Sequence, residues 1–171
     1  MTLGQHLVEL RKRISIAALA IVVFSIPAWW AVDYVWAALS APVLEVAERQ
    51  NRDATLAYTT IGEAFDTRLL IMFLIGVVAS SPIWLYQLWA FIVPALHQRE
   101  KRFAIGFLAA SVPLFVGGCL AAWFVFPNIV ILLTSFAFVD SASFLSARIY
   151  LDFAIKFILA IGVGFLFPVV L

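Results

Sequence analysis

Two glutamates within short basic segments are the residues whose types and spacing best suit a chemical task. Glu9 lies in the stretch HLVELRKR, and Glu100 lies in the stretch HQREKR. A carboxylate can accept two parallel hydrogen bonds from a guanidinium group, so these glutamates could hold arginine side chains of a ligand. A plainer interpretation stays open, in which Glu100 balances its basic neighbours and Glu9 forms an i,i+4 pair with Arg13 worth about 0.3–0.5 kcal/mol.

The sequence contains no pattern that indicates catalysis, a metal site or a cofactor. It has no G-x-S-x-G, Walker or H-E-x-x-H pattern. His6 and His97 are far apart and have no neighbouring ligands, and the single cysteine, Cys119, cannot form an intramolecular disulfide. Cys119 lies in an apolar run and is expected to be a small buried hydrophobe. We therefore expect a protein that is not an enzyme, needs no cofactor or metal and binds no nucleic acid.

The composition places these glutamates in a membrane protein. Of the 171 residues, 65% are hydrophobic and 12% are charged, and the mean hydropathy is +1.07. A soluble domain is only about 45–50% apolar. A chain this short cannot bury the excess in its own core, so the apolar surface must face lipid. We predict an all-α, polytopic transmembrane protein with a single transmembrane domain that covers residues 1–171.

Four apolar segments are long enough to cross a hydrocarbon core about 30 Å thick. They cover residues 14–36, 65–93, 103–127 and 149–171. Each holds an internal proline, which removes a backbone donor and bends its helix: Pro27, Pro82, Pro113 and Pro168. Four bent spans favour a curved wall or cup over a straight bundle. The last segment reaches Leu171 without a basic flank, so we expect the chain to be truncated at its C-terminus.

Basic residues are unevenly distributed over the segments that flank these spans. The N-terminal flank and the 94–102 loop together carry six basic and two acidic residues, a net charge of +4. The rest of the chain carries five basic and eight acidic residues, a net charge of −3. Because basic flanks stay on the cytoplasmic side, we expect the N-terminus and the 94–102 loop in the cytoplasm, and the 37–64 and 128–148 loops outside.

Asp152 and Lys156 are charged residues inside the fourth apolar segment, and their i,i+4 spacing places them on one face of a helix. One interpretation is a coupling pair in a small-solute or ion transporter whose proline kinks act as gates. The other is an interfacial pair whose charges reach outward to the headgroup region. The residue types leave both open.

Four stretches of the chain resemble the TatC family, the multispanning subunit of the twin-arginine protein translocase. They are HLVELRKR at 6–13, SAPVLEV at 40–46, SPIWLYQLWAFIVPALHQREKR at 81–102 and YLDFAIKFILAIGVGFLFPVV at 150–170. The resemblance covers essentially the whole chain in order. Its most specific block is Y-Q-x-W-x-F-x-x-P-x-L-x-x-x-E at 86–100.

The resemblance implies a receptor for signal peptides that carry paired arginines and lead folded proteins across a membrane, with the proton-motive force as the energy source. It implies a bacterial or archaeal cytoplasmic (inner) membrane rather than an organellar one. The expected partners are twin-arginine signal peptides, the single-span TatA and TatB subunits, the lipid bilayer and further copies of the chain.

The same resemblance assigns roles to individual residues. By motif, Glu9 and Glu100 are the carboxylates that bind the arginine pair, and Arg11, Phe91 and Pro94 match positions that matter at the same site. Three further residues match structural or assembly positions of the family: Pro42, in the first outer loop, and Glu63 and Phe65, in its E-x-F pattern.

The chain also departs from the family pattern. Leu166 stands where the family usually carries an acid in F-E-x-P, which puts partner docking through that span in doubt, and Ile61 stands where a proline is common. The family has six spans and this chain shows four, so we expect a fragment of a longer protein.

Overall fold

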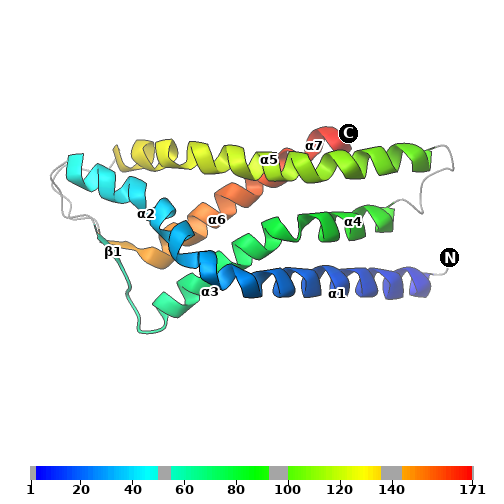
Figure 1. The fold of residues 1–171 in the computed structure, drawn as a ribbon, viewed down its shortest axis with the longest axis horizontal. Helices are drawn as coiled ribbons and strands as arrows, with labels where there is room; N and C mark the ends of the chain where they lie inside the picture. Colours follow the sequence, from blue (N-terminus) through cyan, green and yellow to red (C-terminus); the bar gives the residue numbers. More distant parts are fainter. Residues whose placement is uncertain (1–2, 50–54, 93–99, 136–143, 171) are drawn as a thin grey trace.

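Helices dominate the computed structural model, which describes residues 3–49, 55–92, 100–135 and 144–170 (Figure 1). The first half contains α1 (Leu3–Ala28), the 3₁₀ turn η1 (Trp29–Ala31), α2 (Val32–Arg49), β1 (Thr55–Ala57), α3 (Glu63–Ala79) and α4 (Ser81–Ile92). The second half contains α5 (Glu100–Ser135), β2 (Phe144–Ser146), α6 (Ala147–Gly164) and α7 (Phe167–Val170). The predicted all-α class is confirmed.

Helices that can cross a membrane are recognised by their length and apolar composition. Within the described residues two stretches qualify, Leu7–Val46 and Ala109–Leu133, and α3 with α4 supplies a third if this bent pair is one span. The fourth predicted segment coincides with α6 and α7. Helix α6 has 18 residues and includes three charged ones, Arg148, Asp152 and Lys156, and it is not among the stretches that qualify by these criteria.

The predicted second span is broken into two helices at Ser80. Helices α3 and α4 meet there at an angle of 60°, and Pro82 is the second residue of α4. A proline in the first turn of a helix gives up no intrahelical hydrogen bond. The carbonyl of Ser80 accepts hydrogen bonds from the backbone N–H groups of Ile83 and Trp84, at 2.9 and 3.2 Å, and so starts the new helix.

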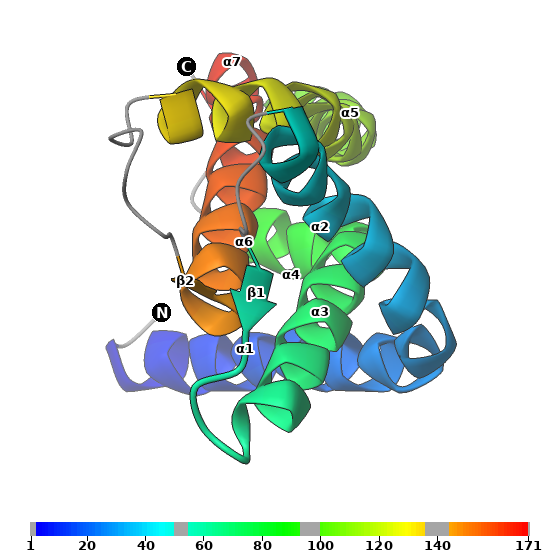
Figure 2. The same ribbon diagram turned by 90° about the vertical axis from the view of Figure 1, so that its left-hand side faces the viewer.

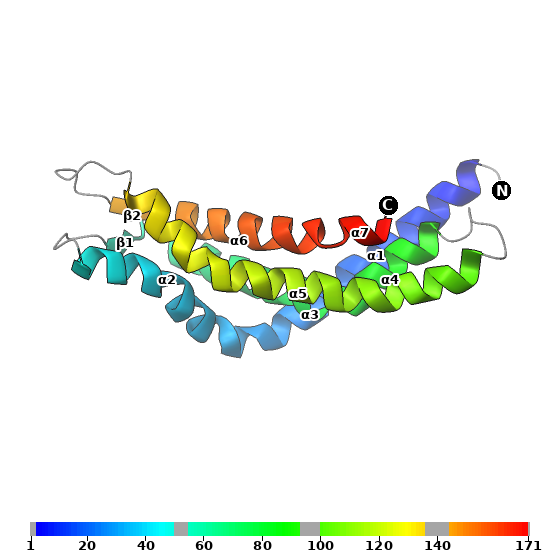
Figure 3. The ribbon, with the colours of Figure 1, turned by 90° about the horizontal axis from the view of Figure 1, so that it is seen from above.

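Three of the other prolines lie inside long helices, and the chain turns from α1 into α2 just after the first of them (Figure 3). Helix α5 continues through Pro113 and Pro127, and Pro27 lies in the last turn of α1, just before η1. Seen from above, α5 is bowed, and α6 lies on its concave side (Figure 3). The bowed outline agrees with the predicted curved wall.

Part of the predicted 37–64 loop is a helix. Helix α2 continues to Arg49, and its side chains Leu39, Val43 and Val46 are buried. Their spacing of three and four residues puts them on one helical face that packs into the core. The prediction of a loop here was wrong because it relied on the polar residues of the segment and overlooked the three- and four-residue spacing of its apolar residues.

The core lies where α5 and α6 pack against α2, α3 and α4, and glycines mark two close helix crossings, that of α5 with α6 and that of α1 with α3. A Cβ atom on Gly162 of α6 would lie 2.5 Å from Sγ of Cys119 on α5, and a Cβ on Gly76 of α3 would lie 2.1 Å from Oγ of Ser25 on α1. Both crossings are therefore close approaches that need a glycine. Cys119 is buried, as predicted.

A short parallel sheet connects the loop after α2 to the segment before α6 (Figure 2). Strand β1 pairs with β2 through Thr55–Phe144, Leu56–Leu145 and Ala57–Ser146. The pairing holds together two loops that are separated by more than 80 residues in the sequence.

Candidate functional site

The two ends of the molecule differ in chemistry. The beginning of α1, the end of α4 and the beginning of α5 lie together at the end that is on the right of Figure 1, which we call the basic end. Strands β1 and β2 lie at the opposite end, which we call the sheet end. The predicted carboxylates Glu9 and Glu100 belong to helices that start at the basic end.

Glu9 is paired within its own helix. Its Oε1 accepts hydrogen bonds from Nη2 and Nε of Arg13, at 2.6 and 3.1 Å. The Glu9 side chain is 25% exposed and that of Arg13 is 23% exposed. The i,i+4 pair predicted from spacing is thus confirmed. Among the described residues, no hydrogen bond reaches Oε2 of Glu9.

Two polar contacts hold α4 between α1 and α5 near the basic end. Nη1 of Arg13 donates to Oε1 of Gln87 on α4, at 3.3 Å. Nε1 of Trp89, half a turn further along α4, donates to Oγ of Ser111 on α5, at 3.0 Å. Gln87 and Trp89 both belong to the Y-Q-x-W-x-F block, so this block fixes the spacing of the helices that carry the two glutamates.

The remaining predicted residues of the basic end are placed as follows. Arg11 is exposed on α1, and Phe91 is half-buried near the end of α4. Glu100 is the first residue of α5, although its side chain lies outside the described part of the structure. Pro94 also lies outside the described residues. The backbone therefore brings the helices of Glu9, Phe91 and Glu100 to one end, and no distance between the two carboxylates is defined.

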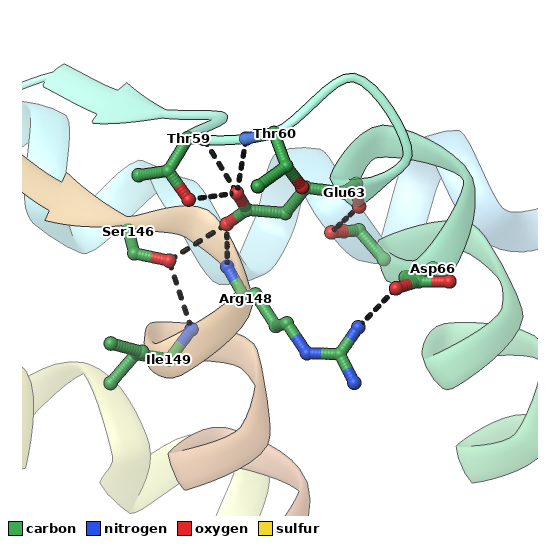
Figure 4. Close-up of polar contacts among 8 residues, drawn as sticks. Thr59, Thr60, Glu63, Asp66, Ser146, Arg148 and Ile149 are labelled. Atoms are coloured by element: carbon green, nitrogen blue, oxygen red, sulfur yellow. Dashed lines mark hydrogen bonds and ion pairs between the residues drawn. The ribbon is translucent and has the colours of Figure 1, made fainter.

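Another carboxylate, that of Glu63, lies at the centre of a hydrogen-bond network at the sheet end (Figure 4). Its Oε2 accepts from the backbone N–H and the hydroxyl of Thr59, both at 2.5 Å, and from the N–H of Thr60 at 3.2 Å. Its Oε1 accepts from the hydroxyl of Ser146 at 2.7 Å and from the N–H of Arg148 at 3.0 Å. One buried side chain thus joins the loop before α3 to the beginning of α6.

Glu63 precedes the apolar run that begins at Phe65. The hydrogen-bond donors around its carboxylate favour the ionised form. The side-chain hydrogen bonds from Thr59 and Ser146, with backbone bonds from Arg148 and Thr59, outweigh desolvation and lower the pKa of Glu63 from 4.5 to about 2. The guanidinium of Arg148 pairs with Asp66, one turn further along α3. The network therefore stays charged and intact at neutral pH.

A local sequence signal for this network exists and was not used in the prediction. Thr60 and Glu63 have the T-x-x-E spacing of a capping box, in which the glutamate side chain reaches back to a backbone N–H before the helix. The structure contains this contact, and the N–H of Glu63 donates to the carbonyl of Thr60 at 3.1 Å. Ser146 caps α6 by accepting from the N–H of Ile149 at 3.4 Å.

The other residues assigned by resemblance occupy different environments. Pro42 is buried inside α2, whereas Phe65 is 58% exposed at the beginning of α3. Leu166 is half-buried between α6 and α7 and packs against the core. Ile61 is fully exposed. An acid at position 166 would therefore sit against apolar side chains, which gives a physical reason for leucine at this position.

Two further ion pairs lie on the surface of the helices. Arg68 of α3 pairs with Asp33 of α2 at 2.8 Å, and its guanidinium lies 5.4 Å from the ring centroid of Trp29. Asp152 and Lys156 pair along α6, with side chains 50% and 73% exposed. The predicted pairing of Asp152 with Lys156 is confirmed. The described residues contain no cluster of three or more His, Cys, Asp or Glu side chains that could hold a metal ion.

Comparison with known proteins finds one family. The profile of Sec-independent protein translocase protein (TatC) matches residues 5–171. The TatC protein of Xylanimonas cellulosilytica is 40% identical over 171 residues, which cover 100% of this chain and 62% of that relative. The TatC protein of Escherichia coli is 31% identical over 171 residues, which cover 96% of this chain and 63% of that relative. This chain thus spans less than two-thirds of the length of either protein.

A solved structure has the same fold. A crystal structure described as the twin arginine translocase receptor TatC superposes with a TM-score of 0.81 at 34% identity, and the match covers 96% of this chain and 72% of the other. The match covers nearly the whole chain, so the overall fold is shared with that protein.

Proposed function

The chain belongs to the TatC family of Sec-independent protein translocase proteins, and from this premise we propose that it binds the paired arginines of signal peptides at its basic end. In this proposal Glu9 and Glu100 are the contact residues, and the cargo is a folded protein that crosses the membrane. The observation that carries the proposal is the meeting of α1, α4 and α5 at one end, because it brings the helices of both glutamates together.

The chemistry of Glu9 supports the proposal. Its carboxylate accepts the guanidinium of Arg13 through Oε1, so the surroundings of Glu9 can accommodate an arginine side chain. The contact is three-quarters covered by protein, and a partly desolvated charged hydrogen bond is stronger than one in open water. A planar guanidinium fits such a carboxylate better than an ammonium group does, which supports selection of arginine over lysine.

The charges around the two glutamates support both the orientation and the selectivity. The basic end has a net charge of +4, which favours the cytoplasmic side of a bacterial inner membrane. The same charge repels peptides that are merely basic. Only a peptide whose arginines reach the glutamates would gain enough from contact to overcome this repulsion.

Further partners belong to the proposal as well. We include the single-span TatA and TatB subunits and further copies of the chain, because membership of the TatC family suggests them. Residues of the sheet end, Glu63, Pro42 and Phe65, take structural or assembly roles in this scheme. Glu63 supports the scheme through its five hydrogen bonds, which hold the loops at that end in one arrangement.

The proposal is tested by measuring the affinity of the protein for an Arg-Arg signal peptide after charge-neutral substitutions. Glu9→Gln and Glu100→Gln each remove a charge-assisted contact. Because the Glu9 side chain keeps a quarter of its exposure, we expect a loss at the lower end of the range for charged pairs, about 2 kcal/mol or about 30-fold. Glu45→Gln, an exposed acid on α2, is the matched control and should leave the affinity unchanged.

The peptide also requires a control. A Lys-Lys version of the same peptide should bind the unchanged protein more weakly than the Arg-Arg version, and Glu9→Gln should reduce this difference. Unchanged Arg-Arg affinity in both glutamate variants would reject the assignment of these carboxylates as the receptor site.

The transporter alternative is weighed by the geometry of the Asp152–Lys156 pair. A coupling pair in a transporter is expected between helices that move against each other. Here both partners belong to α6 and both side chains are at least half exposed, so their contact would survive a movement between helices. This observation favours the receptor proposal.

A further inference from the structure

An apolar pocket lies between α2, α3, α5 and α6. Its volume is about 250 Å³, and its ten lining residues include Val35 of α2, Ile75 of α3, Val116 and Leu120 of α5, and Ile158 of α6. The lining contains no charged, amide or hydroxyl side chain. Leu120 is 54% exposed, so the pocket opens at the surface of α5. Because Val35 and Leu120 belong to the two stretches that can cross a membrane, this opening faces lipid rather than water.

The size and chemistry of the pocket indicate what can fill it. A buried water molecule makes about three hydrogen bonds, which this lining cannot supply. One turn of a helix, about 5.4 Å long and about 10 Å wide, fills about 400 Å³, so a partner helix is too large. A methylene group is about as large as a water molecule in the liquid, about 30 Å³, so the pocket holds about eight of them. An extended hydrocarbon chain from the bilayer therefore fits, and it supplies the contacts that the lining atoms would lose beside a void.

An ion pair lies on the same side of α3 as the pocket, closer to the sheet end. Arg68 is seven residues, or two turns, before Ile75 on α3, so both lie on one face of the helix, about 10 Å apart along its axis. Nη2 of Arg68 donates to Oδ1 of Asp33 at 2.8 Å, and the two side chains are 40% and 73% exposed. The Arg68 guanidinium also lies 5.4 Å from the ring centroid of Trp29. Because tryptophan favours the headgroup level of a membrane, the pair lies where the headgroup of a lipid with one chain in the pocket would be.

We propose that the pocket and the Asp33–Arg68 pair together bind one zwitterionic phospholipid, with an acyl chain in the pocket and the headgroup at the pair. The lipid phosphate accepts hydrogen bonds from the Arg68 guanidinium. The ammonium of the headgroup is attracted by the Asp33 carboxylate and by the face of the Trp29 ring. Since the pair has no net charge, it complements a headgroup of one phosphate and one ammonium better than an anionic headgroup, which Asp33 repels. The inference does not rest on peptide binding at the basic end.

The test measures lipid binding to the full chain after purification in detergent and removal of lipid. Native mass spectrometry counts the bound lipids as one of two probes is added, either zwitterionic dioleoylphosphatidylcholine or anionic dioleoylphosphatidylglycerol, which has the same acyl chains. We expect one tightly bound lipid per chain and about two- to fivefold higher affinity for phosphatidylcholine, the range of a partly exposed charged contact. Phosphocholine alone, which has no acyl chain, should not bind.

A double variant tests the role of the ion pair. Arg68→Gln with Asp33→Asn should still bind lipid through the pocket but should lose the preference for phosphatidylcholine. The matched control is Asp152→Asn with Lys156→Gln, which removes another exposed pair, on α6, and should keep the preference. Equal affinity of the unchanged protein for the two lipids, or a preference that survives the loss of the Asp33–Arg68 pair, would overturn the proposal.

A single variant tests the pocket. Val116→Phe places a ring in the space for the acyl chain and should weaken the binding of both lipids at least about fivefold, the lower end of the cost of overpacking an apolar site. Val23→Phe, at an exposed position of α1, is the control and should bind both lipids normally. The proposal is also overturned if Val116→Phe unfolds at the same temperature as the unchanged protein and binds lipid equally well, or if the unchanged protein binds only a second copy of the chain.

Discussion

The ion pair between Glu9 and Arg13 at the basic end predicts that removing a basic residue strengthens the binding of a basic peptide. Arg13 occupies Oε1 of Glu9 through two hydrogen bonds, so an incoming arginine must share the carboxylate with Arg13 or displace it. Replacing Arg13 with glutamine removes the competitor, although it also removes a basic residue from the site. If Glu9 is a receptor carboxylate, Arg13→Gln should therefore tighten the binding of an Arg-Arg signal peptide.

The magnitude follows from the exposure of the pair. An exposed i,i+4 ion pair contributes about 0.3–0.5 kcal/mol, and hydrogen bonds to well-buried charged groups contribute about 1.5–3 kcal/mol. The Glu9 and Arg13 side chains are 25% and 23% exposed, which places the pair between these limits. We assign it about 1 kcal/mol, so its loss should increase the affinity about fivefold.

The control for this prediction is Lys12→Gln. Lys12 is exposed and neighbours Arg13, so its substitution removes the same charge without releasing Glu9. Affinity measured by fluorescence anisotropy of a labelled peptide should increase more in Arg13→Gln than in Lys12→Gln. The reasoning is refuted if the two variants bind equally well, or if Arg13→Gln binds more weakly than the unchanged protein.

Three further predictions concern stability in detergent, measured by thermal unfolding. The folded-state pKa of Glu63 is about 2 and its ordinary value is 4.5, so its stabilising contribution is complete above pH 4.5 and is lost as the pH falls toward 2. The melting temperature of Glu63→Gln should therefore be lower than that of the unchanged protein at pH 7, and the two melting temperatures should be closer at pH 3. The same difference in melting temperature at both pH values would contradict the network. Tyr150→Phe should cost about 1 kcal/mol, because the buried hydroxyl donates to the carbonyl of Leu39, and an unchanged melting temperature would exclude that bond. Gly162→Ala should lower the melting temperature, whereas Gly164→Ala should leave it equal or higher, since only the first Cβ meets other atoms; the reverse order would show that the α5–α6 packing is wrong.

The sequence was informative wherever the physics is local or periodic. Long apolar runs predict membrane helices because unpaired backbone groups are too costly in lipid. The pairs Glu9–Arg13 and Asp152–Lys156 were predictable because residues four apart share a helical face. The break beside Pro82 was predictable because proline fits the first turn of a helix and not its interior, so it favours the start of a new helix.

The sequence did not predict contacts between segments that are far apart along the chain. Glu63 receives hydrogen bonds from Ser146 and Arg148, which are 83 and 85 residues away, and no local pattern specifies such partners. The bond from Arg13 to Gln87 spans 74 residues and depends on how α1 crosses α4. The T-x-x-E spacing before α3 identifies only the local half of the Glu63 network.

The central claim is that the basic end, formed by α1, α4 and α5, faces the cytoplasm, the side from which the proposed signal peptides would bind. It is tested most directly by labelling single cysteines with a membrane-impermeant maleimide, in a background where Cys119 is replaced by alanine. Lys12→Cys reports on the basic end, and Ile61→Cys, at a fully exposed position, reports on the sheet end. The account predicts that intact cells label only Ile61→Cys and that Lys12→Cys reacts after permeabilisation. Labelling of Lys12→Cys in intact cells, with Ile61→Cys protected, would contradict it.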